Sequence, residues 1–198
     1  MSGGPQLLWL LIGPNGAGKT TYYEHRVRPH LAAEVVNADR IAAAEWPGRE
    51  VAHGYDAARK AEARRLELLA AGRSFVAETV FSHPSKLDLV REAQQAGYEV
   101  WVSFIGLESA DLAVARVAER VGAGGHDVPA AKIRERFDRL APLAVRAVEM
   151  ADRAFVLDNS DPRRPLRDVL LFERGRCTYV ARDLPGWTGR LFAGHLGP

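Results

Sequence analysis

The stretch that decides the fold is Gly13-Pro14-Asn15-Gly16-Ala17-Gly18-Lys19-Thr20. It fits the phosphate-binding pattern G-x-x-x-x-G-K-[ST], in which glycines let backbone N–H groups turn inward around phosphate oxygens. The lysine of this pattern reaches the β- and γ-phosphates, and the hydroxyl of its last residue binds Mg²⁺. The motif therefore predicts a nucleotide-binding loop, made of Gly13, Pro14, Asn15, Gly16, Ala17, Gly18, Lys19, Thr20 and Thr21.

The sequence around the loop has the context that this motif requires. The apolar run Leu7–Ile12 predicts a buried strand before it, and Thr20–Arg28 can form the helix whose positive end faces a bound anion. Similar runs, separated by helix-length segments, follow at Glu34–Asn37, Ser74–Ala77, Glu99–Ile105 and Ala154–Leu157. Such an alternation indicates crossover connections. We therefore expect an α/β fold of the P-loop NTPase class, with a mostly parallel five-stranded sheet and helices on both faces.

The segments between the strands predict helices over Glu50–Ala71, Pro84–Ala96 and Asp111–Val121. A fourth helix opens at Pro129, and Pro142 is expected to kink or split it. In the C-terminal part, two short apolar runs around Glu173-Arg174-Gly175-Arg176 predict a β-hairpin over about residues 167–182. No linker interrupts this order, so residues 1–198 are expected to form a single P-loop kinase domain.

Composition excludes several classes of protein. Lys+Arg 27 and Asp+Glu 25 leave a net charge of +2, which argues against a general nucleic-acid or membrane-surface binder. The run Leu7–Ile12 is far too short to span a bilayer and lacks the features of a signal peptide. The one cysteine, Cys177, rules out an intrachain disulfide and fits the reducing cytoplasm. We therefore expect a cytoplasmic protein without membrane contact.

Carboxylates follow two of the predicted strands. Asp39 comes after Glu34–Asn37, and Glu78 after Ser74–Ala77, so both should project toward the same rim as the phosphate loop. There, one carboxylate can accept the proton of a substrate hydroxyl and another can hold Mg²⁺. Alternatively, Asp39 caps a helix and Glu78 is a solvated loop residue. Asp158 also ends a strand, but the composition of the run Asp158–Pro162 is typical mainly of a turn.

A segment rich in arginine lies further along the chain. From Arg116 to Arg146 it carries seven cations and four anions, a net +3. The glycine-rich break at residues 122–129 between two arginine-bearing helices suits a mobile lid over about residues 116–140, which would bring guanidinium groups onto a transferring phosphoryl group. The alternative is a solvated, salt-bridged face. His126, by itself, is more often a structural or capping residue.

Several segments together resemble the zeta-toxin family of P-loop kinases, in particular its short, predicted-ATPase branch. They keep their order and cover roughly residues 7 to 160: Gly13–Thr21, Val36–Ala42, Phe75–Ser82, Gly97-Tyr98, Phe104–Leu107, Arg116–Val121, Gly124–Pro129 and Ala151–Ser160. The resemblance implies an adenylate-kinase-like sheet and ATP/Mg²⁺-dependent phosphorylation of a small hydroxyl-bearing molecule. In characterised zeta toxins this molecule is a UDP-activated amino sugar. The substrate-binding insertion and the longer C-terminal part of the toxins have no counterpart that can be placed here.

The resemblance also implies roles for single residues. Asp39 matches the acceptor-activating aspartate, and Glu78 matches the glutamate on the substrate side. The expected catalytic residues are Lys19, Asp39, Arg116 and Arg120. The expected acceptor-binding residues are Asp39, Glu78, Thr79, His126, Arg134 and Arg136. Thr20 and Glu78 are the expected Mg²⁺ ligands.

These observations predict an ATP-dependent kinase of a small molecule such as UDP-N-acetylglucosamine, with GTP as an alternative donor and an antitoxin protein as a partner. Three other functions stay open. One is an ATPase switch module that acts through a partner, and another is a nucleic-acid 5′-end kinase, which the low net charge disfavours. The third is an antibiotic-modifying phosphotransferase, which differs only in its acceptor.

Overall fold

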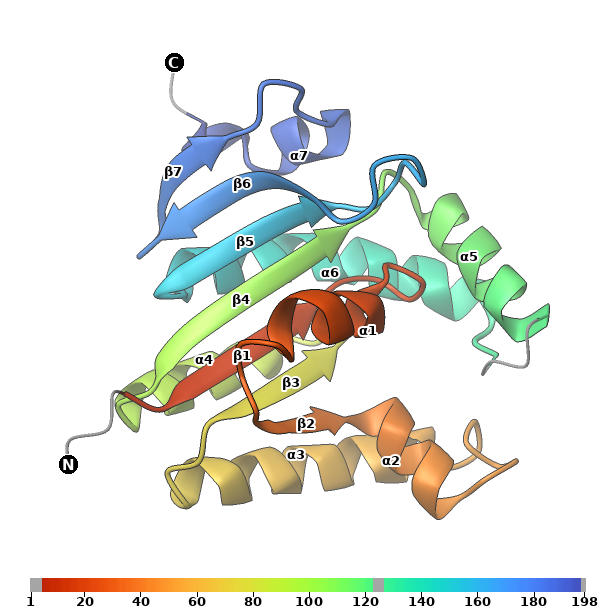
Figure 1. Ribbon diagram of the computed structural model, residues 1–198. Coiled ribbons are helices and arrows are strands. Elements are labelled where there is room, and N and C mark those ends of the chain that lie inside the picture. The colour runs from red at the N-terminus through yellow and green to blue at the C-terminus, as the bar shows by residue number, and fades with distance from the viewer. Residues whose placement is uncertain (1–4, 123–126, 197–198) are drawn as a thin grey trace.

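The computed structural model describes residues 5–122 and 127–196. They form one sheet of seven strands in the order β2-β3-β1-β4-β5-β6-β7 (Figure 1). Five neighbouring strands are parallel: β2 (Glu34–Asn37), β3 (Phe75–Thr79), β1 (Leu7–Ile12), β4 (Glu99–Gly106) and β5 (Arg153–Asp158). The predicted α/β P-loop fold with a five-stranded parallel sheet is therefore confirmed.

The predicted hairpin extends this sheet. Its strands, β6 (Arg167–Glu173) and β7 (Arg176–Val180), pair antiparallel with each other, and β6 pairs antiparallel with β5. The mixed sheet thus ends at β7, whose residues are mostly exposed. An antiparallel addition needs only short connections, whereas each parallel strand needs a crossover.

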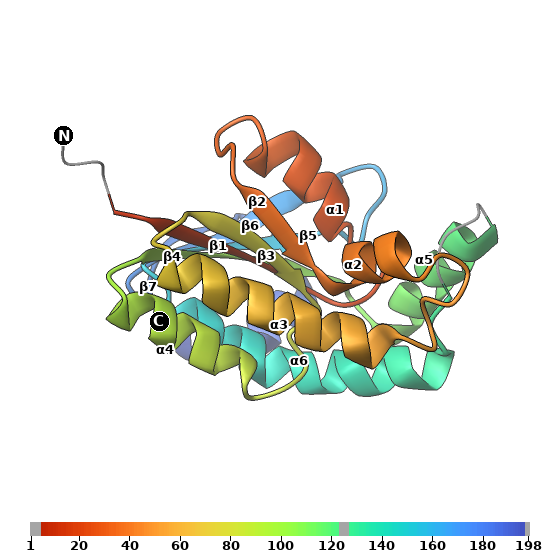
Figure 2. The ribbon, with the colours of Figure 1, turned by 90° about the horizontal axis from the view of Figure 1, so that it is seen from below.

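Both faces of the sheet carry helices, as Figure 2 shows. Helices α3 (Gly54–Ala70), α4 (Lys86–Gln95) and α6 (Ala130–Met150) cover one face. On the other face lie α1 (Lys19–Tyr22) and the π-helical turn that continues it (Tyr23–Val27). Strand β1 therefore contributes to two cores, because Leu8 and Leu10 pack toward α3, α4 and α6 whereas Trp9 and Leu11 pack toward α1.

Two remaining helices lie near the carboxyl ends of the parallel strands: α2 (Ala38–Glu45), directly after β2, and α5 (Ala110–Gly122), after β4. A short C-terminal helix, α7 (Gly186–Leu191), buries Trp187 against the larger core. Among the helices of the described ranges, none combines the length and hydropathy needed to cross a bilayer.

The helix boundaries differ in places from those predicted. Helix α3 begins at Gly54 and not at Glu50, and α4 begins at Lys86, two residues after Pro84. Of the two outcomes predicted for Pro142, a kink or a split, the split is wrong, since α6 continues through it to Met150. Pro142 and Asp138, whose carbonyl loses its helical partner, are both exposed, so water can solvate that carbonyl. The buried side of α6, from Ile133 to Val148, holds the helix together across this point.

Candidate active site

The predicted phosphate loop connects β1 to α1 at the carboxyl end of the sheet (Figure 1). Gly16 and Gly18 both have left-handed backbone angles, with φ of 74° and 88°. A Cβ atom on Gly16 would lie 3.1 Å from the Cβ of Arg116, so the loop packs closely against α5. The two glycines thus supply the conformation and the close approach that side chains at these positions would prevent.

Lys19 is the first residue of α1 and lies over the loop. Its Nζ donates hydrogen bonds to the carbonyl oxygens of Gly13 and Pro14, each at 2.9 Å. Burial lowers the pKa of Lys19, the charges of Glu78 and Asp39 raise it, and those of Arg120 and Arg136 lower it further. Four side chains predicted for the site from other elements therefore lie within electrostatic range of this ammonium group.

Glu78 lies on β3 beside the loop. It is buried, at 9% exposure, and is paired in register with Leu11 of β1 and Asn37 of β2. The hydroxyl of Thr20 donates to its carboxylate, with Oγ1 at 3.1 Å from Oε1 and 3.3 Å from Oε2. The reading of Glu78 as a solvated loop residue is therefore wrong. A hydroxyl and a carboxylate side by side are hard oxygen ligands of the kind that Mg²⁺ prefers, so these residues fit a magnesium ion beside bound phosphates.

Asp39 lies in the first turn of α2 with an exposed side chain. The alternative role of helix cap falls to Asn37, whose Oδ1 accepts hydrogen bonds from the N–H groups of Asp39 at 2.7 Å and Arg40 at 3.4 Å. The carboxylate of Asp39 is therefore not used as the cap. Its charge instead raises the pKa values of Lys19 and Arg136, so it lies within electrostatic range of both side chains.

The predicted arginines take different places. Arg136 of α6 is half-buried, and burial lowers its pKa while Asp39 and Glu135 raise it. Arg120 of α5 acts on Lys19 through its charge. Arg116 instead reaches the carbonyl oxygen of Ser160 at 3.5 Å, and Arg134 pairs with Asp111 of α5 at 2.8 Å. Thus Arg120 and Arg136 lie within electrostatic range of Lys19, whereas Arg134 links α6 to α5.

The other predicted residues contribute less to this geometry. Thr79 Oγ1 accepts a hydrogen bond from Phe81 N at 3.1 Å and so stabilises the turn after β3. Thr21 is exposed on α1. His126 lies outside the described residues.

The turn after β5 also contacts the phosphate loop, which its sequence did not indicate. Asn159 Nδ2 donates a hydrogen bond to the carbonyl oxygen of Ala17, inside the phosphate loop, at 2.8 Å. Sequence reasoning assigned Asp158–Pro162 mainly to turn chemistry and missed this contact. The signal was available, because β5 is parallel to β1 and its carboxyl end reaches the same rim.

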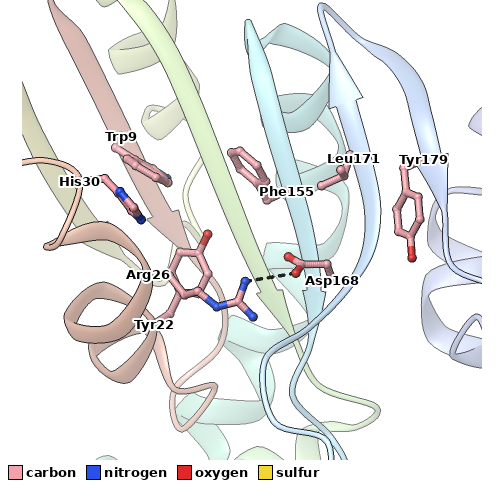
Figure 3. A pocket seen from close by; sticks show the side chains of 8 residues that line it. All are labelled: Trp9, Tyr22, Arg26, His30, Phe155, Asp168, Leu171 and Tyr179. Atoms are coloured by element: carbon pink, nitrogen blue, oxygen red, sulfur yellow. Dashed lines mark hydrogen bonds and ion pairs between the residues drawn. The ribbon is translucent and has the colours of Figure 1, made fainter.

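A separate cavity of about 460 Å³ lies beside α1 and the π-helical turn that continues it (Figure 3). It is lined by Trp9, Tyr22, Arg26, His30, Phe155, Asp168, Leu171 and Tyr179, with Arg26 paired to Asp168 at 3.2 Å. The residues predicted for the nucleotide site do not line it. The candidate active site is therefore the rim around Lys19 and not this cavity.

Solved structures share the fold of this chain. One is from the PezAT chromosomal toxin–antitoxin system of Streptococcus pneumoniae, with a TM-score of 0.63 and 18% identity over 85% of this chain and 72% of that one. The AvrRxo1-ORF1:-ORF2 structure with ATP gives a TM-score of 0.70 and 15% identity over 98% of this chain, which spans 65% of its counterpart. Shikimate kinase from Acinetobacter baumannii, in complex with shikimate, gives 0.51 and 19% over 80% of this chain and 86% of that one.

The sequence match to a family covers the phosphate loop, both carboxylates and the arginines of α5 and the first part of α6. Residues 8–143, more than half of the chain, match the AAA domain family. Together with the shared fold, this match confirms the P-loop kinase fold that the resemblance implied. The chain is thus a member of the AAA domain family and has a P-loop kinase fold.

Proposed function

We propose that this protein is an ATP/Mg²⁺-dependent phosphotransferase that phosphorylates a hydroxyl group of a small molecule. The observation that carries the proposal is the convergence on Lys19 of two carboxylates, Asp39 and Glu78, and two arginines, Arg120 and Arg136. A binding module needs the loop and its lysine, but phosphoryl transfer also needs a proton acceptor and cations that neutralise the transferring phosphoryl group.

In this proposal each residue has one task. Lys19 and the N–H groups of the loop bind the β- and γ-phosphates. The Asp39 carboxylate orients the acceptor hydroxyl and takes its proton. Arg120 and Arg136 neutralise the charge that spreads over the oxygens of the transferring phosphoryl group. Thr20 and Glu78 would hold Mg²⁺, which supplies charge neutralisation at the phosphates when bound.

The acceptor class follows from analogy. The AvrRxo1 structure contains ATP, which supports ATP as the donor, with GTP as the alternative. Neighbours include a chain of a toxin–antitoxin system and a shikimate kinase with its substrate. We therefore propose a small-molecule acceptor, with a UDP-activated amino sugar such as UDP-N-acetylglucosamine as the first candidate, and an antitoxin protein as the candidate partner.

A transfer screen tests this function. The wild-type protein is incubated with labelled ATP and, in separate reactions, UDP-N-acetylglucosamine and other UDP-sugars, nucleosides, aminoglycosides, phenicols and oligonucleotides. We expect label on one small-molecule class and none without acceptor. Label on oligonucleotide ends would support a 5′-end kinase instead. ATP hydrolysis that no acceptor stimulates would contradict transfer and support the switch module.

A further inference from the structure

Asn159 is held on three sides in the turn after β5. Its side-chain Nδ2 donates to Ala17 O at 2.8 Å, and its Oδ1 accepts from Leu166 N at 3.0 Å. Its own backbone N–H donates to Gly106 O at 3.1 Å. A carbonyl on one side and an N–H on the other determine which way the amide faces, because only the nitrogen can donate and only the oxygen can accept.

The contact with Ala17 sets the orientation of one peptide group of the phosphate loop. The carbonyl and the N–H of a trans peptide point in opposite directions, and the structure contains no cis peptide among its described residues. Since Ala17 O points at Asn159, the N–H of Gly18 points away from it. Gly18 and Asn159 are also in close contact, because a Cβ on Gly18 would lie 2.7 Å from Asn159 Nδ2.

The turn that carries Asn159 is itself anchored. Asp158 is buried, at 5% exposure, and its Oδ1 accepts hydrogen bonds from Ser160 Oγ at 2.6 Å and from Trp187 Nε1 at 2.9 Å. Ser160 Oγ also accepts from Glu108 N at 2.8 Å. The turn therefore holds Asn159 in place, and Asn159 in turn contacts the phosphate loop through Ala17.

We propose that Asn159 is a positioning residue for nucleotide binding, which holds the Ala17–Gly18 peptide in its phosphate-binding orientation before the nucleotide arrives. This inference rests on the proposed function, since it takes the loop to bind phosphates. A loop ordered in advance binds more tightly, because less conformational freedom is lost on binding. Asn159 acts through Ala17, so we expect it to change the affinity for the phosphates of the nucleotide and not the affinity for the base or the acceptor.

Two substitutions separate the hydrogen bond from other effects. Asn159→Asp keeps the acceptor for Leu166 N–H but removes the donor to Ala17 O. Asn159→Ala removes the same donor, and also the acceptor for Leu166 N–H, without adding charge. We expect both to raise the Kd of ATP by roughly three- to tenfold, the factor that corresponds to one hydrogen bond. The Kd of inorganic tripolyphosphate should rise by the same factor, while kcat at saturating ATP stays within about threefold.

The measurement is calorimetric titration of full-length wild type and both variants, at a temperature where circular dichroism shows each to be folded. Unchanged Kd values in the variants would overturn the inference, as would weaker binding in Asn159→Asp alone, which would reveal a charge effect. A loss for ATP without a loss for tripolyphosphate would also overturn it, because Asn159 would then act on the nucleoside. Wild type that binds neither probe would refute the proposed function together with this inference.

Discussion

At the scale of single residues, Lys19 combines burial with opposing charges. It sits between two carboxylates and two arginines, and burial lowers its pKa. In the folded state the lysine therefore binds its proton less tightly than in the unfolded chain. The free energy of unfolding should therefore rise with pH between the pKa of Lys19 in the folded state and its higher pKa in the unfolded chain. Phosphate binding depends on the protonated form, because only the ammonium attracts the anion.

This residue gives a prediction about pH. As pH rises through the lowered pKa of Lys19, below the usual value of about 10.4 for a lysine, ATP affinity should fall as the ammonium loses its proton. Titrations over a series of pH values would measure the fall. Lys19→Arg stays charged and should give a flatter profile, so an identical fall in that variant would show that another group is responsible.

Asp39 gives a second prediction at this scale. Asp39→Asn keeps the shape of the side chain but removes the proton acceptor, so kcat should fall by roughly 10²- to 10⁴-fold. The Kd of ATP should change little, because the loop is untouched. Fixed-time transfer assays would measure kcat, and calorimetric titration would measure the Kd of ATP. The matched control is Asp88→Asn on α4, an exposed carboxylate paired with Arg91. Equal loss of binding and turnover in folded Asp39→Asn would refute the assigned role.

At the scale of elements, α6 shows how a long amphipathic face can outweigh a local break. Its buried residues, from Ile133 through Leu140 to Val148, continue past Pro142. The sequence identified both the apolar spacing and the proline. It could not show which of the two would prevail, since that depends on whether the freed carbonyl of Asp138 faces water or the core.

Replacing Pro142 should therefore stabilise the helix. Pro142→Ala restores a helical N–H and should raise the free energy of unfolding by about 2 to 3 kcal/mol, the helix-interior cost of proline less its restriction of the unfolded chain. Urea unfolding followed by circular dichroism would measure it. Arg139→Ala on the exposed side serves as the control and should stay within about 0.5 kcal/mol. A destabilised Pro142→Ala would show that the proline is required where it stands.

At the scale of the whole molecule, the C-terminal part packs against the turn that contacts the phosphate loop. The family match ends at residue 143, whereas β5, the hairpin and α7 follow it in the chain. The ring of Trp187 packs so closely on Gly106 that a Cβ there would lie 2.2 Å from it, and its Nε1 donates to Asp158. The last helix is thus connected to the turn that anchors the phosphate loop.

Trp187→Phe tests this connection. The ring contact is kept in part, but Asp158 loses a donor in a buried position, so the free energy of unfolding should fall by about 1 to 3 kcal/mol. Urea unfolding would measure it. The control is Trp46→Phe, a partly exposed residue that stacks on His53 at 4.7 Å and should change stability by about 0.5 kcal/mol or less. Equal effects at the two positions would show that the Asp158 hydrogen bond contributes nothing of its own.

The sequence by itself determined the phosphate loop, the parallel strands and the carboxylates at their ends. These features are local, because the glycine spacing sets the loop, and a strand buried on both faces reads as a continuous apolar run. Asp39 and Glu78 could be named for the same reason, as each lies at the carboxyl end of such a strand, Glu78 within β3 and Asp39 two residues after β2.

Only the tertiary structure decided how these residues are divided among roles. It assigned the helix cap to Asn37 and left Asp39 exposed, and it paired Glu78 with Thr20. Of the arginines, it brought Arg120 and Arg136 within range of Lys19 and joined Arg134 to Asp111. It also placed Asn159 on the loop, 142 positions from Ala17. Such contacts depend on how distant elements pack, and no spacing along the chain records that.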